Sequence, residues 1–271
     1  MTQTVQMMPR NAKLDEIRRA IESINLSRMR HKEPEKKELP KNMNRQKCEM
    51  FSDYMTDLFV NTCNHEKISG RFQNWKEKTD AEKLKLASDI LNVFLDKLGK
   101  EIAKRQVPIY QRNGVEYQGT NDKMDETITA DIAKMPEITV KPIEQPKPND
   151  AMYVSSKREL FINMENPAYK SSPSNFLTSL RHEFTHIVDM FIPSISPLEP
   201  DVREEAMRSY VRPDENKDLY NKNPLELNAN MKKEEYKQRI DAMLTLQETE
   251  RNRAINMNYV SMMMRGYGRA A

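Results

Sequence analysis

Apolar residues recur every three or four positions along much of the chain, which is the spacing of helices with one buried face. The pattern predicts a helix over residues 45–64 and a longer one over residues 80–105. In the first, four side chains are expected to share the buried face: Met50, Tyr54, Leu58 and Phe59. The second is expected to begin with a capping box, in which Thr79 and Glu82 satisfy each other's backbone N–H groups.

Between residues 107 and 164 the pattern changes to short extended segments separated by turns. The pair Asn113-Gly114 predicts a β-hairpin over residues 109–117. Three further strands are expected, over residues 138–140, 151–154 and 160–164. The chain is thus expected to have an α+β fold that is mostly helical, with a small β-sheet.

The next predicted helix begins with Ser172 as N-cap and Pro173 in its first turn, and it ends before Pro193. Its apolar face is formed by Phe176, Leu177, Leu180, Phe184, Ile187, Val188 and Phe191. Polar residues fall within an arc of roughly 100° on the opposite side: Asn175, Thr178, His182, Thr185, His186 and Asp189. Such a helix packs one face on a core and presents chemical groups on the other.

Beyond Pro193 the chain is expected to be rich in loops, with a short helix near residues 202–210. Asn223-Pro224 then begins a last long helix, because proline is favoured in a first turn. Three regions follow from these patterns: a basic arm, partly helical or flexible, at residues 1–44; a folded domain at residues 45–250; and a tail at residues 251–271.

Composition narrows the classes of function. The 271 residues include 31% charged and 37% hydrophobic residues, but the net charge is only +3, which argues against a dedicated nucleic-acid binder. The charge is uneven, because residues 1–45 carry +5 and the remainder carries −2. A basic arm of this kind is typical of a solvated tail, or of a segment that contacts an acidic partner or a membrane surface.

The cysteines and the N-terminal residues bear on the compartment. Cys48 and Cys63 are too few for a disulfide framework, so a reducing compartment and a core-packing role are expected for both thiols. No apolar run resembles a signal peptide, and none reaches the about 18 residues of a membrane span. A cytoplasmic location is expected, with export as an effector by a signal-peptide-independent system as the alternative.

The clearest chemical signal is His182-Glu183-Phe184-Thr185-His186, an H-E-x-x-H motif inside the predicted helix. Imidazoles four residues apart lie one turn apart on the same face, so both can reach one metal ion. Glu183 between them can hold the water that such a metal activates. A polar stripe that faces solvent is the alternative interpretation of the two histidines.

A catalytic zinc site needs a third protein ligand and leaves one position open for water. No histidine follows His186, so the ligand is expected to be a carboxylate, with a thiolate from the distant cysteines as the alternative. Asp189 shares the helix face but lies about 7–8 Å beyond the midpoint of the two imidazoles along the axis, too far for an aspartate. It is expected either to orient an imidazole or to be an exposed charge.

Glu226 is the stronger candidate for the third ligand, because it lies in the first turn of the last predicted helix. The other glutamates considered lie in loops or on solvated helices: Glu199, Glu204, Glu205, Glu234 and Glu235.

An H-E-x-x-H motif followed by a helical N-x-x-E-x-x-A segment resembles the gluzincin branch of the zinc metallopeptidases. The second motif consists here of Asn223, Glu226 and Ala229. The residues 186–189, His-Ile-Val-Asp, are also similar to those of lethal-factor-like members. Residues 1–78 match no part of this family, and they are the candidate segment for docking a partner.

The resemblance implies a zincin-like core in which His182, His186 and Glu226 bind Zn²⁺. Leu160–Met164 would be the edge strand of its sheet, whose unpaired backbone groups could bind an extended peptide. The domain would comprise a helical part, strands with the metal helix, and a glutamate helix, at residues 45–106, 107–193 and 223–250.

The expected function is that of a zinc-dependent metalloendopeptidase acting on a protein substrate. Glu183 would accept a proton from the activated water and pass it to the leaving amine. The oxyanion needs a further hydrogen-bond donor, for which Tyr220 is the first candidate and Tyr210 the reserve. Lethal-factor-like enzymes also have a tyrosine upstream of the ligand glutamate, but a core or surface tyrosine is the alternative interpretation.

Two other functions fit the same motif. A regulatory protease could switch off a transcriptional repressor that docks on residues 1–78. A non-catalytic binding module could keep a zincin scaffold with zinc as a structural feature, although such a role would not require Glu183.

Overall fold

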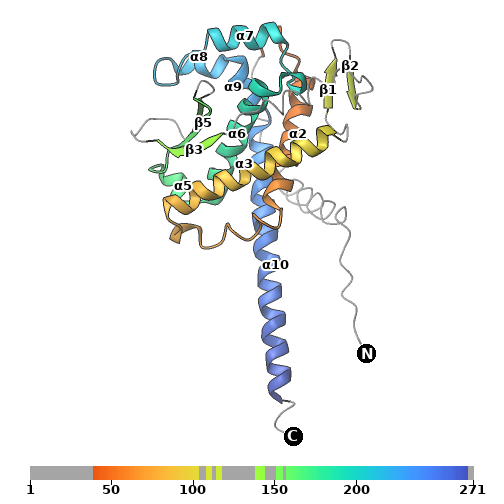
Figure 1. Ribbon diagram of the computed structural model, residues 1–271, viewed down its shortest axis with the longest axis vertical. Coiled ribbons are helices and arrows are strands. Elements are labelled where there is room, and N and C mark those ends of the chain that lie inside the picture. The colour runs from red at the N-terminus through yellow and green to blue at the C-terminus, as the bar shows by residue number, and fades with distance from the viewer. Residues whose placement is uncertain are drawn as a thin grey trace, which may run out of the picture. The chain divides into compact units, whose positions relative to one another are not determined.

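The structure is a computed structural model that describes residues 39–103, 108–111, 114–117, 138–143, 151–154 and 157–267. Within these residues it is mostly helical with two small sheets, as expected for an α+β fold (Figure 1). Lys37–Lys237 forms one compact unit, and residues 238–271 belong to a second. The partly helical or flexible arm expected at residues 1–44 lies almost entirely outside the described residues.

Helix α2 (Arg45–Cys63) begins at Asn44, whose side chain accepts a hydrogen bond from the Lys47 N–H at 3.0 Å. Its predicted extent is confirmed, but its predicted face is partly wrong. Met50 and Tyr54 are only half-buried, whereas Phe51 and Met55 are fully buried. The helix contacts α3 (Asp80–Ala103), α6 (Pro173–Phe191) and α9 (Pro224–Ala229). Its buried arc is therefore set by several neighbours rather than by one core-facing stripe.

Helix α3 (Asp80–Ala103) begins with the predicted capping box. The Thr79 N–H donates to Glu82 Oε2 at 2.8 Å, and the Glu82 N–H donates to Thr79 Oγ1 at 3.2 Å. Before this helix, the short 3₁₀ helix η1 (Trp75–Glu77) places an indole N–H that donates to the Tyr169 carbonyl at 2.6 Å. Local sequence and one distant contact together fix this end of the helix.

The predicted hairpin is confirmed as two antiparallel strands, β1 (Pro108–Gln111) and β2 (Gly114–Tyr117). The second sheet has three strands, listed in chain order: β3 (Thr139–Pro142), β4 (Ala151–Val154) and β5 (Glu159–Ile162). Their order in space is β3-β5-β4, with β3 parallel and β4 antiparallel to β5.

The expectation that residues 160–164 form an edge strand is therefore wrong. Strand β5 is central, because β4 pairs with one side of it and β3 returns to the other side. The edges are β3 and β4. Alternation of apolar and polar residues predicts that a segment is a strand but does not predict its neighbours, which depend on the path of the chain.

Helix α6 (Pro173–Phe191) carries the H-E-x-x-H motif, and it contacts α2, α5 (Pro167–Ser171), α9 and β4 (Figure 1). Ser172 is its N-cap residue as predicted, although its side chain makes no capping hydrogen bond. The Phe184 ring packs against Phe59 of α2 and Phe94 of α3, with ring centroids 5.6 and 5.0 Å away. The apolar side of the motif is thus anchored in the core.

Four helical segments follow α6 within this unit: η2 (Pro193–Ile195), α7 (Pro200–Arg208), α8 (Lys217–Lys222) and α9 (Pro224–Ala229). Both α7 and α8 contact α9, and the three gather at one end of the unit in Figure 1. The short helix expected near residues 202–210 is confirmed as α7. Helices α5 and α8 were not expected, since both are too short to show a helical period.

The predicted single helix over residues 223–250 is wrong, because α9 ends at Ala229 and a separate helix, α10, spans Lys233–Tyr267. Asn230 follows α9, and its side-chain amide donates to the Glu226 carbonyl at 2.9 Å. Lys232 adopts a left-handed conformation with φ of 56°. This left-handed backbone interrupts the helical conformation between α9 and α10. Helix α10 also runs through most of the region expected to be a tail.

Among the described residues, no helix is both long enough and apolar enough to cross a membrane.

Candidate metal centre

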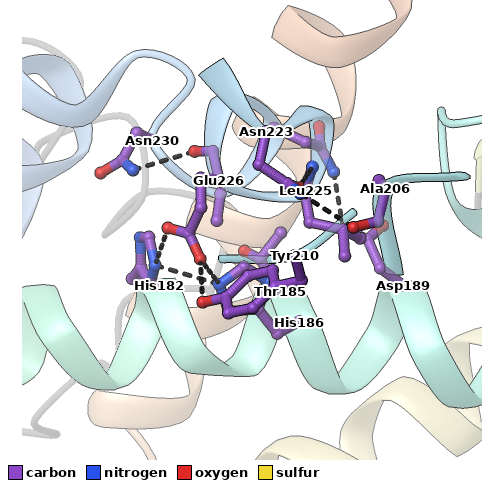
Figure 2. A network of polar contacts seen from close by, with 12 residues as sticks. His182, Thr185, His186, Asp189, Ala206, Tyr210, Asn223, Leu225, Glu226 and Asn230 are labelled. Carbon is purple, nitrogen blue, oxygen red and sulfur yellow. Dashed lines mark hydrogen bonds and ion pairs between the residues drawn. The ribbon is translucent and has the colours of Figure 1, made fainter. Parts of the chain in front are cut away.

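Three side chains from two helices converge at one point (Figure 2). His182 and His186 project from successive turns of α6, and Glu226 projects toward them from the first turn of α9. The two Nε2 atoms are 3.1 Å apart. Glu226 places Oε2 3.3 Å from His182 Nε2 and Oε1 3.3 Å from His186 Nε2. The three residues predicted as a ligand set therefore lie close enough together to bind one metal ion.

The group lies inside the protein rather than on its surface. Side-chain exposure is 12% for His182, 9% for His186 and 1% for Glu226. A polar stripe facing solvent, the alternative interpretation of the two histidines, would leave both imidazoles largely exposed. That interpretation is excluded by the burial of the pair.

The spacing of the donor atoms fits a metal ion. Bonds of about 2.0–2.2 Å in a tetrahedral site place neighbouring ligand atoms about 3.3–3.6 Å apart. The nearest donor pairs here are 3.1, 3.3 and 3.3 Å apart, and one ligand atom from each residue keeps all three within 4.8 Å. Two imidazoles and a carboxylate are a known donor set of catalytic zinc. This buried group can hold a metal ion.

The electrostatics of the group favour a positive charge at its centre. Burial alone would lower the pKa of His186, but the hydrogen bond and charge of Glu226, with the charges of Glu183 and Asp189, raise it to about 9. Burial would likewise raise the pKa of Glu226, but both histidines outweigh it and hold that pKa below its usual range. A buried carboxylate in its charged form is therefore ready to bind a cation.

Helix α9 is held in place by the other residues of the N-x-x-E-x-x-A motif. Asn223 caps the helix through its Oδ1, which accepts from the Leu225 N–H at 2.9 Å. Its amide also donates to the Ala206 carbonyl of α7 at 2.8 Å. At the other end, the Ala229 carbonyl accepts a hydrogen bond from Arg181 at 3.1 Å. Both ends of the short helix are thus fixed by contacts outside it.

Both candidate tyrosines lie beside the ligand carboxylate. The Tyr210 hydroxyl donates to Glu226 Oε1 at 2.9 Å, and the rings of Tyr210 and Tyr220 meet edge to face with centroids 6.0 Å apart. Burial, followed by the negative charge of Glu226, raises the pKa of both hydroxyls. Both therefore stay protonated as hydrogen-bond donors. Tyr210, the reserve candidate, makes the 2.9 Å hydrogen bond to Glu226, and a hydrogen bond to Glu226 also contributes to the raised pKa of Tyr220.

Glu183 is also part of this buried environment. It follows His182 directly on α6 and is only 6% exposed. Its negative charge contributes to raising the pKa of His186, Tyr210 and Tyr220. The carboxylate therefore lies within electrostatic reach of the ligands and of both tyrosines.

Asp189 neither orients an imidazole nor is an exposed charge, the two interpretations drawn from the sequence. It is fully buried rather than exposed. Its carboxylate accepts hydrogen bonds from Ser196 Oγ at 2.6 Å and from Asn228 Nδ2 at 2.9 Å, while the buried Nδ1 of His186 has no hydrogen-bond partner among the described residues. Asp189 therefore bonds to Ser196, which follows α6, and to Asn228 on α9, and not to an imidazole.

The other acids and the thiols considered as ligands lie elsewhere. Three of those glutamates pair with cations in the described structure: Glu199 with Lys47, Glu204 with Arg208 and Glu235 with Lys232. The two cysteines are buried and belong to no metal-ligating group among the described residues. The fold thus brings Glu226, and not these alternatives, to the histidine pair.

Sequence reasoning missed two residues that support the site. Arg181 is fully buried, and its guanidinium donates to Ser52 of α2 at 2.8 and 2.9 Å and lies 4.2 Å from the Tyr236 ring centre. Asn228 is buried and bonds to Asp189. An arginine beside a histidine motif and an asparagine in a polar segment resemble surface residues, so no local signal identifies either one.

Comparison with protein-family models, curated proteins and solved structures finds no significant match to this chain.

Proposed function

We propose that this protein is a zinc-dependent metalloendopeptidase that hydrolyses peptide bonds of a protein substrate. The observation that carries the proposal is the convergence of His182, His186 and Glu226 on one buried point, with the buried Glu183 directly after His182 on α6. A structural zinc site commonly has four protein ligands, whereas a catalytic one has three and an open position. Among the described residues, the group has three ligands and a buried glutamate beside them in the sequence, which favours the catalytic kind.

The ligand residues define what the metal would contribute. His182 and His186 would bind through Nε2 and Glu226 through a carboxylate oxygen, the atoms that already face one another. When bound, zinc lowers the pKa of water and polarises a carbonyl group. The surrounding low-dielectric environment strengthens both effects, because the ligands are almost fully buried.

Glu183 would move the proton in this reaction. Its carboxylate accepts one proton from the attacking water as the water oxygen bonds to the peptide carbonyl carbon. It then delivers that proton to the nitrogen of the leaving amine as the carbon–nitrogen bond breaks. The products are a carboxylic acid and an amine, which exchange the remaining proton to give a carboxylate and an ammonium group, and Glu183 returns to its charged form.

A tyrosine hydroxyl would stabilise the oxyanion that forms on the carbonyl oxygen. Tyr210 is the better placed of the two, because its hydroxyl already donates to a ligand oxygen at the site. A substrate carbonyl bound beside Glu226 could accept this hydrogen bond in place of the carboxylate. Tyr220, whose ring packs against Tyr210, would then orient the Tyr210 ring.

An extended peptide is the substrate form that best fits the fold. Strand β4 is an edge of the three-stranded sheet, and it contacts α6, the helix with the two histidines. An edge strand offers backbone N–H and C=O groups to a further strand. A substrate paired with β4 would lie beside the metal helix, and this role replaces the one expected of residues 160–164.

The same proposal includes a zincin-like fold, zinc as the metal, and docking of a partner on residues 1–78. Its support is the order of a helix, a small sheet, a metal helix and a later glutamate-bearing helix along one compact unit. The chain's own residues, rather than any relative, carry the proposal.

The deciding experiment compares the wild-type protein with the Glu183→Gln variant. Both are loaded with one equivalent of zinc, and cleavage of a peptide library and of denatured protein is followed by mass spectrometry with and without a chelator. The wild type is expected to cleave peptides in a chelator-sensitive manner. Glu183→Gln is expected to keep its zinc but lose cleavage by several orders of magnitude, since a glutamine cannot accept the proton.

Two outcomes would contradict the proposal. Equal cleavage by Glu183→Gln would remove the general-base assignment. Zinc binding by the wild type without any cleavage would instead favour the non-catalytic zincin scaffold.

A further inference from the structure

Besides the contacts among the ligand atoms themselves, a buried hydrogen bond between side chains joins the two ligand-bearing helices. Asp189 lies one turn after His186 on α6, and Asn228 lies two residues after Glu226 on α9. The Asn228 amide donates to Asp189 Oδ2 at 2.9 Å. Asp189 and Asn228 are 0% and 1% exposed, so water does not compete for this hydrogen bond.

Helix α9 needs such contacts, because it is too short to be rigid by itself. It has 6 residues, fewer than two turns. Isolated helices below about 12–15 residues are marginal in water, so the position of α9, and with it that of Glu226, depends on tertiary contacts. Ligand atoms must be held to within a few tenths of an ångström for strong metal binding.

Three of the hydrogen bonds that hold α9 differ in what else they support. The bond from Asn223 ties α9 to α7, not to the histidine helix. The bond from Arg181 ties α9 to α6, but the same guanidinium also bonds to Ser52 of α2. The hydrogen bond between Asp189 and Asn228 joins α6 to α9, and among the described residues the Asn228 amide makes no bond to a third helix.

The second oxygen of Asp189 is also held. Ser196 Oγ donates to Oδ1 at 2.6 Å and accepts from the Leu198 N–H at 3.3 Å. The carboxylate therefore cannot rotate freely, and its other oxygen stays directed at Asn228. Fixing one partner makes the hydrogen bond to α9 a more exact positional constraint.

We propose that Asp189 is a positioning residue for the metal centre. Through Asn228 it sets the distance between Glu226 and the two imidazoles, and so determines metal affinity. The inference rests on the metal site of the proposed function but not on peptide cleavage. It assigns to Asp189 a role toward the glutamate ligand, in place of a role toward a histidine.

A buried aspartate could instead stabilise the fold without affecting the site, and two measurements separate these roles. A purely structural role lowers the melting temperature of the metal-free protein and leaves the Kd for zinc of the folded protein unchanged. A positioning role raises the Kd for zinc. Both are measured on full-length, metal-free protein, with zinc affinity obtained by competition with a chelator at a temperature well below melting.

The sharpest variants exchange the two side chains. Asp189→Asn removes the charged acceptor, because the new amide can face Asn228 only with a neutral oxygen or with an N–H, and the Kd for zinc is expected to rise about 10–100-fold. Combining it with Asn228→Asp restores the hydrogen bond with donor and acceptor reversed. The double variant is expected to recover most of the lost affinity, which a general loss of stability would not do.

Ser196→Ala is the matched control, because it removes a bond to the same carboxylate without touching α9. Its effect on the Kd for zinc is expected to be several-fold smaller than that of Asp189→Asn. Asn228→Ala provides an independent test if Asp189→Asn does not fold, and it should also raise the Kd about 10–100-fold.

Three results would overturn the inference: an unchanged Kd in both single variants, no recovery in the exchanged pair, or an equal effect of Ser196→Ala. Failure of the wild type to bind zinc at all would instead contradict the proposed metal site. If the wild type binds zinc but cleaves no peptide, only the proposed peptidase activity is contradicted.

Discussion

The hydroxyl of Tyr210 donates a hydrogen bond to Oε1 of Glu226 at 2.9 Å, so a side chain from the loop after α7 reaches a ligand carboxylate on α9. This contact links two residues 16 positions apart that belong to no common element. It places a protonated donor directly at the candidate metal centre. In the proposed reaction, this donor would contact a substrate carbonyl.

Replacing Tyr210 by phenylalanine is expected to slow peptide cleavage without removing the metal. Loss of one oxyanion donor typically lowers kcat about 10²–10³-fold. Tyr220→Phe is the matched control and should have a smaller effect, because its ring can still pack against Tyr210. Steady-state kinetics with a peptide substrate, alongside zinc quantification, tests this. Equal kcat in Tyr210→Phe and the wild type would contradict the assignment.

Removing the carboxylate ligand is expected to weaken zinc binding severely. Glu226→Ala leaves two imidazoles without their buried partner, so the Kd for zinc should rise by more than the about 10–100-fold typical of residues outside the ligand shell. Glu235→Ala is the control, since Glu235 is an exposed acid that pairs with Lys232. Chelator competition measures both. Unchanged affinity in Glu226→Ala would indicate that another carboxylate binds the metal.

The aromatic residue inside the motif is expected to stabilise the fold. Phe184 is 0% exposed and packs against Phe59 and Phe94. Phe184→Ala should lower the free energy of unfolding by about 3–5 kcal/mol, because it leaves a cavity beneath the metal helix. Phe184→Leu should cost less, since it fills part of that space. Urea unfolding of the metal-free protein gives both values, and a loss below about 1 kcal/mol in Phe184→Ala would contradict this packing.

The two thiols are expected to be unreactive in the folded protein. Burial is the main cause that raises the pKa of Cys48 to about 12, and burial also raises the pKa of Cys63. The reactive thiolate is the deprotonated form, so a raised pKa leaves almost none of it at pH 8. A colorimetric thiol reagent should react slowly with the native protein and rapidly with both cysteines in denaturant. Rapid reaction of either thiol in the native state would contradict its burial.

Much of the local structure followed from the sequence. The capping box of Thr79 and Glu82, the hairpin around Asn113-Gly114 and the extent of the metal helix depend on residues within a few positions of one another. The buried face of α2 could not be predicted from the sequence in this way. Phe51 and Met55 are more buried than Met50 and Tyr54, because several helices pack on α2. Local periodicity contains no information about how many neighbours a helix has.

By itself the sequence determined that His182 and His186 share one face of one helix with Glu183 between them, because a helical repeat is a local property. Only the tertiary structure decided that Glu226 faces them, that Tyr210 contacts that carboxylate, and that Asp189 bonds to Asn228. These pairs are brought together by the path of the chain and the packing of distant helices. That packing is a property of the whole fold, whereas the spacing within a helix is set residue by residue.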